Sequence, residues 1–247
     1  VEAVEIGYKG LHLDETLQVF ASIYQYDYDG YQDELQQFDP IRGAGANFVS
    51  NADGITNTGF EIELYYAATD RLTLSGNFSY TETEYGEDYF VFTVDDPINP
   101  VPVFGTFTQG FVSAQVTDPS QASDYTVNLK GGPLKGIPEE KATIRVSYEQ
   151  DTRFGPLYYL LSHSYTGDFS ASGIQRPLDR IDSRETTNLN ISWYSQDGNL
   201  SLRAYVDNLF DNDNYYALST GDHETNYRKS VTALPPRVMG LDIRYRF

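Results

Sequence analysis

The sequence predicts an all-β fold in which antiparallel strands form a transmembrane β-barrel, and three observations support this prediction. Tyr and Phe are abundant, with 21 and 14 residues among 247, and aromatic side chains favour strands. Apolar and polar residues alternate along most of the chain, as they do in strands with one apolar face. Short turns also alternate with long polar connections, which is typical of outer-membrane barrels.

The alternation predicts about nine strands, and the last of them shows the pattern well. Leu241 and Ile243 point to one face of this strand, whereas Asp242 and Arg244 point to the other. The strand around Tyr158 departs from the pattern because it is apolar on both faces. The nine strands are expected at residues 2–12, 16–31, 47–68, 71–84, 137–149, 156–168, 184–194, 199–209 and 236–247.

The other strands also have one apolar face, and no apolar run reaches the roughly 18 residues that a membrane helix needs. Barrel strands escape that criterion because only one of their faces meets lipid. The expected lipid-facing residues are Leu17, Val19, Ala21, Ile23, Phe60, Ile62, Leu64, Tyr66, Leu72, Leu74, Phe78, Tyr80, Ala142, Ile144, Val146, Tyr148, Thr187, Leu189, Ile191, Trp193, Leu200, Leu202, Ala204 and Val206.

The connections between the predicted strands fall into two classes. Tight turns are expected at residues 14–15, 69–70, 151–155 and 196–198. Long polar stretches, at about 32–46, 85–136, 169–183 and 210–235, alternate with them. In an outer-membrane barrel the short turns lie in the periplasm and the long loops lie outside the cell.

This topology places aromatic residues at the periplasmic ends of several strands. The last outward-facing residues there are Tyr66, Tyr148, Trp193 and Phe247. Aromatic side chains gather at membrane–water interfaces, so we expect these four to form a periplasmic girdle. The alternative is that they are core aromatics of a soluble β-sandwich.

Charge and composition exclude several classes of function. The formal net charge of -19 argues against nucleic acid as a partner, because binding phosphates requires a basic surface. That charge either keeps the chain soluble or attracts cationic ligands to acidic loops. There is no Cys, and His12, His163 and His223 are too scattered to suggest a metal site. No hydrolase or nucleotide-binding motif occurs, so we expect no catalytic residue, no cofactor and no bound metal.

Several stretches resemble the C-terminal barrel of TonB-dependent receptors. Residues 57–64, Asn-Thr-Gly-Phe-Glu-Ile-Glu-Leu, follow Asn-Ala at 51–52 as in that family, and residues 134–138 are similar to its Leu-x-Gly-x-Pro strand entry. The closing run is the most specific. It consists of Val-Asp-Asn-Leu-Phe-Asp at 206–211, Tyr-Tyr at 215–216, Pro-Pro-Arg at 235–237, Gly240 and the terminal Phe247.

The resemblance implies a barrel of 22 strands, preceded by a plug domain and a short energy-coupling box. No stretch of this chain resembles the plug domain or the energy-coupling box, so we expect residues 1–247 to be the C-terminal portion of a larger barrel. An odd strand count ending in the periplasm agrees with this, because a complete bacterial barrel has an even count. Plug domain and N-terminal strands are therefore expected to be absent.

The implied function is a receptor and transporter in the bacterial outer membrane. It would import a scarce ligand, of the siderophore–iron, cobalamin or glycan type, with energy coupled through TonB, and it would not be an enzyme. The implied partners are outer-membrane lipid, the TonB complex through the missing N-terminal region, the outer-membrane assembly machinery, and a small-molecule or glycan ligand.

Two sets of residues are candidates for these contacts. For each residue of the first set, packing within the loop is the alternative that the sequence favours over ligand contact. The ligand candidates, in the expected extracellular loops, are Tyr89, Phe104, Phe107, Tyr215, Tyr216, His223, Tyr227 and Arg228. The expected assembly signal is the alternating apolar end of the chain, Leu241, Ile243, Tyr245 and Phe247.

Two other classes of protein share parts of this pattern. A passive porin-like barrel or a surface enzyme would have the same strands without a plug. A secreted soluble β-sandwich could use its aromatic residues to bind polysaccharide.

Overall fold

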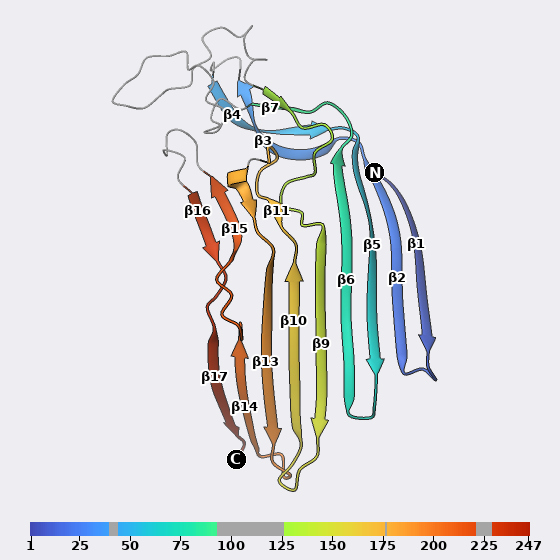
Figure 1. The fold of residues 1–247 in the computed structure, drawn as a ribbon, viewed down its shortest axis with the longest axis vertical. Coiled ribbons are helices and arrows are strands. Elements are labelled where there is room, and N and C mark those ends of the chain that lie inside the picture. Colours follow the sequence, from blue (N-terminus) through green and yellow to red (C-terminus); the bar gives the residue numbers. More distant parts are fainter. Residues whose placement is uncertain (40–43, 93–125, 176, 221–228) are drawn as a thin grey trace, which may run out of the picture.

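The computed structural model describes residues 1–39, 44–92, 126–175, 177–220 and 229–247. Nine long strands form one curved antiparallel sheet, ordered β1-β2-β5-β6-β9-β10-β13-β14-β17 (Figure 1). They are β1 (Glu2–His12), β2 (Leu17–Tyr28), β5 (Ile55–Ala67), β6 (Leu72–Tyr85), β9 (Glu140–Gln150), β10 (Leu157–Thr166), β13 (Arg184–Tyr194), β14 (Leu200–Asp207) and β17 (Val238–Tyr245). The nine predicted strands are confirmed, and β1 and β17 are the two edges of an open sheet.

One end of the sheet, here called the turn end, has only short connections. In the β1–β2 turn Leu13, Asp14 and Glu15 all have positive φ angles, between 52° and 67°. In the β13–β14 turn Asp197 accepts hydrogen bonds from Ser195 and Asn199, and these bonds lower the pKa of its carboxyl group. All four predicted tight turns are confirmed at this end.

The other end, here called the loop end, carries four small hairpins where the sequence predicted long polar connections. The N-terminus of the chain lies at this end and the C-terminus at the turn end (Figure 1). The hairpins are β3 (Tyr31–Asp39) with β4 (Ala44–Ala52), β7 (Phe90–Phe92) with β8 (Thr126–Asn128), β11 (Phe169–Ser170) with β12 (Arg180–Ile181), and β15 (Tyr215–Thr220) with β16 (Lys229–Ala233). A 3-10 helix (Pro177–Asp179) precedes β12.

The predicted strand at 47–68 is in fact two strands, β4 and β5. The break lies at Asp53–Gly54, where Gly54 has φ of +65° and a Cβ atom would lie 2.6 Å from the Glu87 side chain. Only glycine reaches this conformation at low cost, so the chain turns sharply here and leaves the main sheet. The 16–31 prediction is likewise too long, because β2 ends at Tyr28 and Tyr31 begins β3.

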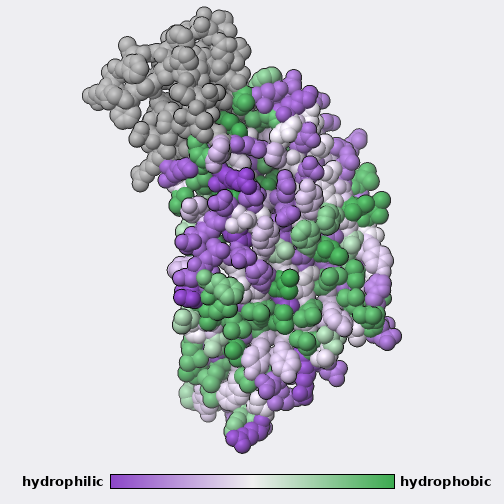
Figure 2. Space-filling view, viewed as in Figure 1, coloured by the Kyte–Doolittle hydropathy of each residue, from purple (hydrophilic) through white to green (hydrophobic). Residues whose placement is uncertain are grey.

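Cross-strand pairing shows that the apolar residues share one face of the sheet. Ile23 pairs with Ile6 and Phe60, and Phe60 in turn pairs with Tyr80. These side chains are exposed, for example Ile6 at 66% and Ile23 at 57% of their surface. Figure 2 shows apolar residues gathered over the turn-end half and hydrophilic residues toward the loop end. A soluble sandwich buries its apolar face, so this exposed face contradicts that alternative.

Strand β10 resolves the one departure from the alternating pattern. Tyr159 pairs with Tyr148 and Ile191, which places it on the apolar face. Tyr158 pairs with Glu149 and Ser192 and therefore lies on the polar face, as does Leu160 two residues later. The polar face thus contains some apolar side chains, but the apolar face keeps its character across this strand.

The predicted girdle residues lie toward the turn end. On the apolar face, Tyr66, Tyr148 and Trp193 lie within the last three residues of β5, β9 and β13. Tyr148 packs against Tyr159 with ring centroids 6.1 Å apart. Phe247 follows β17 and packs edge-on against Tyr245 at 5.0 Å. Their contact with a lipid interface stays a prediction. Among the described residues no helix is long and apolar enough to span a membrane.

Opposite responses to charge are expected at two neighbouring positions of β6. Phe78 lies on the apolar face beside Ile62, whereas Asn77 lies on the polar face opposite Glu63. Phe78→Arg should destabilise the folded barrel in lipid by about 2–4 kcal/mol, the usual cost of Arg near the bilayer centre. Asn77→Arg should cost far less, because Glu63 can pair with the new charge. Urea unfolding of the full-length protein in liposomes measures both, and equal losses would contradict the assignment of the faces.

Candidate functional site

The loop end contains the only buried apolar cluster among the described residues. It consists of Ala52, Ile55, Tyr85, Tyr89, Leu129 and Leu134. Tyr85 and Tyr89 stack in parallel at 5.5 Å, and the Tyr89 hydroxyl hydrogen-bonds the Ser50 side chain. The cluster joins the β3–β4 hairpin to the ends of β5 and β6 and to the segment after β8. It fixes these loop-end elements on the top of the sheet.

A buried carboxylate lies beside this cluster and ties the same elements together. Asp33 is only 5% exposed, and its Oδ2 accepts a hydrogen bond of 2.7 Å from the Tyr85 hydroxyl. Its Oδ1 lies 2.9 Å from Lys135 Nζ, and that ammonium also donates to the Glu34 carbonyl. Burial and the nearby Asp33 charge raise the pKa of the Tyr31 hydroxyl. The carboxylate, Tyr85 and Lys135 are here called the Asp33 latch.

A second polar anchor holds the connection between β14 and β17. Asn208 is 5% exposed with φ of 52°, and its side-chain amide donates to the Asn212 and Pro235 carbonyls at 2.8 and 3.0 Å. The Asn208 backbone N–H donates to Asn188 Oδ1 on β13. Arg237 pairs with Asp211. Residues of the 206–211 motif therefore hold the connection between β14 and β17 in place, which is a structural role.

The predicted ligand residues do not come together as one described site. Tyr89 is 8% exposed and belongs to the buried cluster, so in this structure it packs the loop rather than facing an open pocket. Tyr215 and Tyr216, at the start of β15, are exposed at 39% and 49%. The remaining candidates lie outside the described residues; they are Phe104, Phe107, His223, Tyr227 and Arg228.

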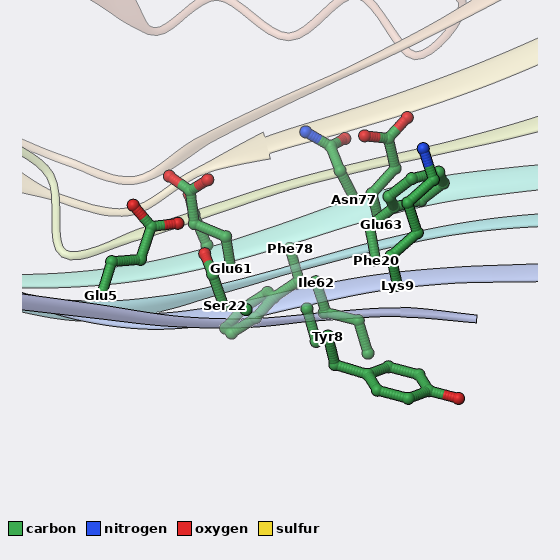
Figure 3. A pocket seen from close by; sticks show the side chains of 13 residues that line it. Glu5, Tyr8, Lys9, Phe20, Ser22, Glu61, Ile62, Glu63, Asn77 and Phe78 are labelled. Atoms are coloured by element: carbon green, nitrogen blue, oxygen red, sulfur yellow. The ribbon is translucent and has the colours of Figure 1, made fainter.

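The polar face holds a hollow of about 440 Å³ near the β1 edge of the sheet. Figure 3 shows Glu5, Glu61 and Glu63 on the polar side of the sheet, whereas Ile62 extends to the opposite side. Lys9 lies on the same side as the carboxylates, with its Nζ 4.8 Å above the Phe20 ring. Three carboxylates therefore face a single ammonium group in this hollow.

A row of tyrosines rises from this hollow along the polar face of β2. Tyr24, Tyr26 and Tyr28 occupy alternate positions of the strand, and Tyr31 continues the row into β3. Successive ring centroids lie 5.1, 6.4 and 6.1 Å apart. These tyrosines were not among the predicted ligand contacts, although Tyr-x-Tyr-x-Tyr on one strand indicates such a row.

Chemically, these groups suit binding rather than bond-breaking. The row offers aromatic rings, and the hollow offers carboxylates, hydroxyls and an amide. Within the part of the chain that the structure describes, no group of three or more His, Cys, Asp or Glu residues is arranged to hold a metal ion.

Comparison with known proteins places the fold in one family. Residues 1–209 match the family model described as TonB dependent receptor-like, β-barrel. Comparison with curated protein sequences finds no match.

Solved structures of uptake receptors share this fold. The ferric yersiniabactin uptake receptor of Yersinia pestis aligns with a TM-score of 0.66 and 16% identity, over 99% of this chain and 29% of that one. A siderophore receptor of Acinetobacter baumannii gives 0.63 and 16%, over 98% and 28%. The ferric-catecholate import receptor of E. coli K12 gives 0.61 and 17%, over 99% and 27%. The chain thus spans less than a third of the length of these structures, and such low identity establishes the fold alone.

The Asp33 latch predicts a local change when Lys135 is replaced. Lys135→Met leaves the Asp33 carboxylate buried without its cation. The expected cost is about 3 kcal/mol, the lower end for a buried pair because Lys135 is 34% exposed. Hydrogen exchange of the β3–β4 hairpin in the full-length protein should then quicken by more than about tenfold.

Lys130→Met is the matched control. Lys130 pairs with Asp88 at 3.6 Å, but both side chains are more than half exposed, so this pair contributes about 0–1 kcal/mol. If both variants leave exchange of the hairpin unchanged, Asp33 does not hold it in place.

Proposed function

We propose that this chain, which belongs to the TonB-dependent receptor β-barrel family, forms the C-terminal part of an outer-membrane importer energised through TonB. The imported ligand is scarce outside the cell and is of the siderophore–iron, cobalamin or glycan type. The observation that carries the proposal is a sheet with an exposed apolar face and a polar face, matched to the family over 209 residues. From here on the polar face is called the lumen face.

The proposed place of residues 1–247 is the last nine strands of a larger barrel, with the plug domain and the other strands contributed by the rest of the receptor. The open edges β1 and β17 support this arrangement. Backbone groups at a free edge have no water to bind within a bilayer, so a membrane sheet must close on further strands. A sheet of nine strands is also too narrow to enclose a plug.

In this scheme the chain performs no covalent chemistry, in keeping with a family of receptors and transporters rather than enzymes. The loop-end hairpins capture the ligand, and the lumen face provides the polar wall that it passes. The work is done by movement of the plug, to which TonB connects. The names of the structural neighbours support uptake as the general activity: they include ferric siderophore receptors and a copper transporter.

A planar-bilayer recording of the full-length receptor tests this proposal. A plugged receptor should show no steady conductance, and deletion of its plug should open a large one. The purified periplasmic domain of TonB should bind the full-length receptor but not residues 1–247. A steady conductance through the intact protein, together with no TonB binding, would instead identify a passive porin.

A second test concerns the proposed assembly signal. Outward-facing Leu241, Ile243 and Tyr245 alternate up to Phe247, and such an end is proposed to be read by the outer-membrane assembly machinery. Phe247→Ala in the full-length receptor should lower the amount of folded protein in the outer membrane. Phe154→Ala is the control, because Phe154 is 60% exposed in a short turn at the same end. Equal amounts of the two variants in outer-membrane fractions would remove the assembly role.

A further inference from the structure

The tyrosine row on the lumen face has an organisation that goes beyond filling space. Tyr24 and Tyr26 stack with an interplanar angle of 21°, whereas Tyr26, Tyr28 and Tyr31 meet edge-on at 68° and 78°. All four side chains are partly exposed. The row therefore forms a continuous aromatic track from the loop end down into the wall, here called the tyrosine track.

The rings of the track are held in place by neighbouring groups. The Tyr24 hydroxyl hydrogen-bonds Thr81 at 2.8 Å, and the Tyr26 hydroxyl donates to Glu5 at 3.5 Å. Tyr28 and Tyr31 pack against the buried loop-end cluster, which the Asp33 latch fastens. A ligand that stacks on these rings would not have to order them first, which favours binding.

The foot of the track is the acidic hollow. Phe20 and Ser22 continue the same line of β2 downward and line the hollow with Glu5, Glu61 and Glu63. Glu5 belongs to both, because it pairs with Tyr24 across β1 and β2 and accepts from Tyr26. Aromatic rings and hydrogen-bond acceptors therefore form one surface.

The charge of this surface selects among the ligand classes. Among the residues that line the hollow, three carboxylates are offset by one ammonium group, Lys9, so a polyanionic iron complex would meet an excess of negative charge, and like charges repel. A neutral polyol meets no such repulsion, and its hydroxyls can donate to the carboxylates. A single cation would require one aromatic cage, whereas four rings in a row suit a ligand that repeats along its length.

We propose that the tyrosine track and the acidic hollow at its foot bind a neutral oligosaccharide on its way through the lumen. The C–H groups of the sugar rings would pack on the parts of the Tyr24, Tyr26 and Tyr28 rings that the ring–ring contacts leave exposed. The sugar hydroxyls would donate to Glu5, Glu61 and Glu63. This inference rests on the proposed import function and specifies its ligand class.

Calorimetric titration of the full-length receptor in detergent tests the proposal. The probes are maltohexaose, cellohexaose and xylohexaose, with ferric citrate as the anionic comparison. At least one oligosaccharide should bind, and ferric citrate should not compete with it. Tyr26→Ala should weaken binding about tenfold through lost stacking, whereas Tyr26→Trp should retain it.

Tyr80→Ala is the matched control, because Tyr80 lies on the apolar face of β6 opposite Phe60 and does not line the hollow, and it should bind like the unaltered receptor. Thermal unfolding of each variant establishes that it is folded. The proposal is overturned if none of the three oligosaccharides binds, if Tyr26→Ala binds as well as the unaltered receptor, or if ferric citrate binds in their place.

The two failures can be told apart. If the receptor is closed in the bilayer and binds TonB but no oligosaccharide, only the proposed ligand class is wrong. In that case the track is wall packing against the rest of the receptor. If the protein conducts steadily and does not bind TonB, the proposed import function is wrong, whichever ligand it binds.

Discussion

Because the hydrocarbon layer of a membrane holds no water, the wall of a β-barrel must satisfy its backbone hydrogen bonds internally. Every backbone N–H and C=O group within the bilayer must find a partner inside the protein, so the chain crosses as hydrogen-bonded antiparallel strands. Such strands direct alternate residues to opposite faces, which is why one sequence can carry Ile23 on the apolar face and Tyr24 on the polar face. The long period-two pattern, the short turns and the exposed apolar face all follow from this requirement.

The loop end is under a different constraint, because polar groups outside a bilayer can form hydrogen bonds with water. The β3–β4 hairpin is held there by a small cluster around Tyr85 and by the Asp33 latch. A buried carboxylate is stable only when its oxygens are satisfied, and Tyr85 and Lys135 each satisfy one of them. Specific polar contacts therefore hold the loop-end segments in place. The same region positions Tyr28 and Tyr31, at the loop-end terminus of the tyrosine track.

The sequence predicts the nine strands of the main sheet better than it predicts the segments of the loop end. The nine strands of the main sheet, their faces and their turns were predictable because one period-two pattern recurs along them. Even β10 follows the pattern once pairing assigns Tyr159 outward and Tyr158 inward. Strand β3 was read as a loop because it has no apolar face to produce an alternation.

The candidate site was harder to predict for the same reason. Tyr89 was chosen because it is an aromatic residue in a long loop, yet the buried cluster encloses it. The tyrosine track was missed because candidates for ligand contact were sought only in the long loops. Spacing gave their common face, but ring contacts between Tyr24, Tyr26 and Tyr28 depend on side-chain orientations that spacing does not determine.

The central claim, that one face of each wall strand meets lipid and the other meets the lumen, has a direct test in β2. Cysteines placed singly at Ala21, Ser22 and Ile23 of the full-length receptor can be labelled with a fluorophore before folding into liposomes that carry lipid-attached quenchers. Strong quenching is expected at positions 21 and 23 and little at position 22, because only the first two lie on the apolar face. Equal quenching at all three positions, or none at positions 21 and 23, would contradict it.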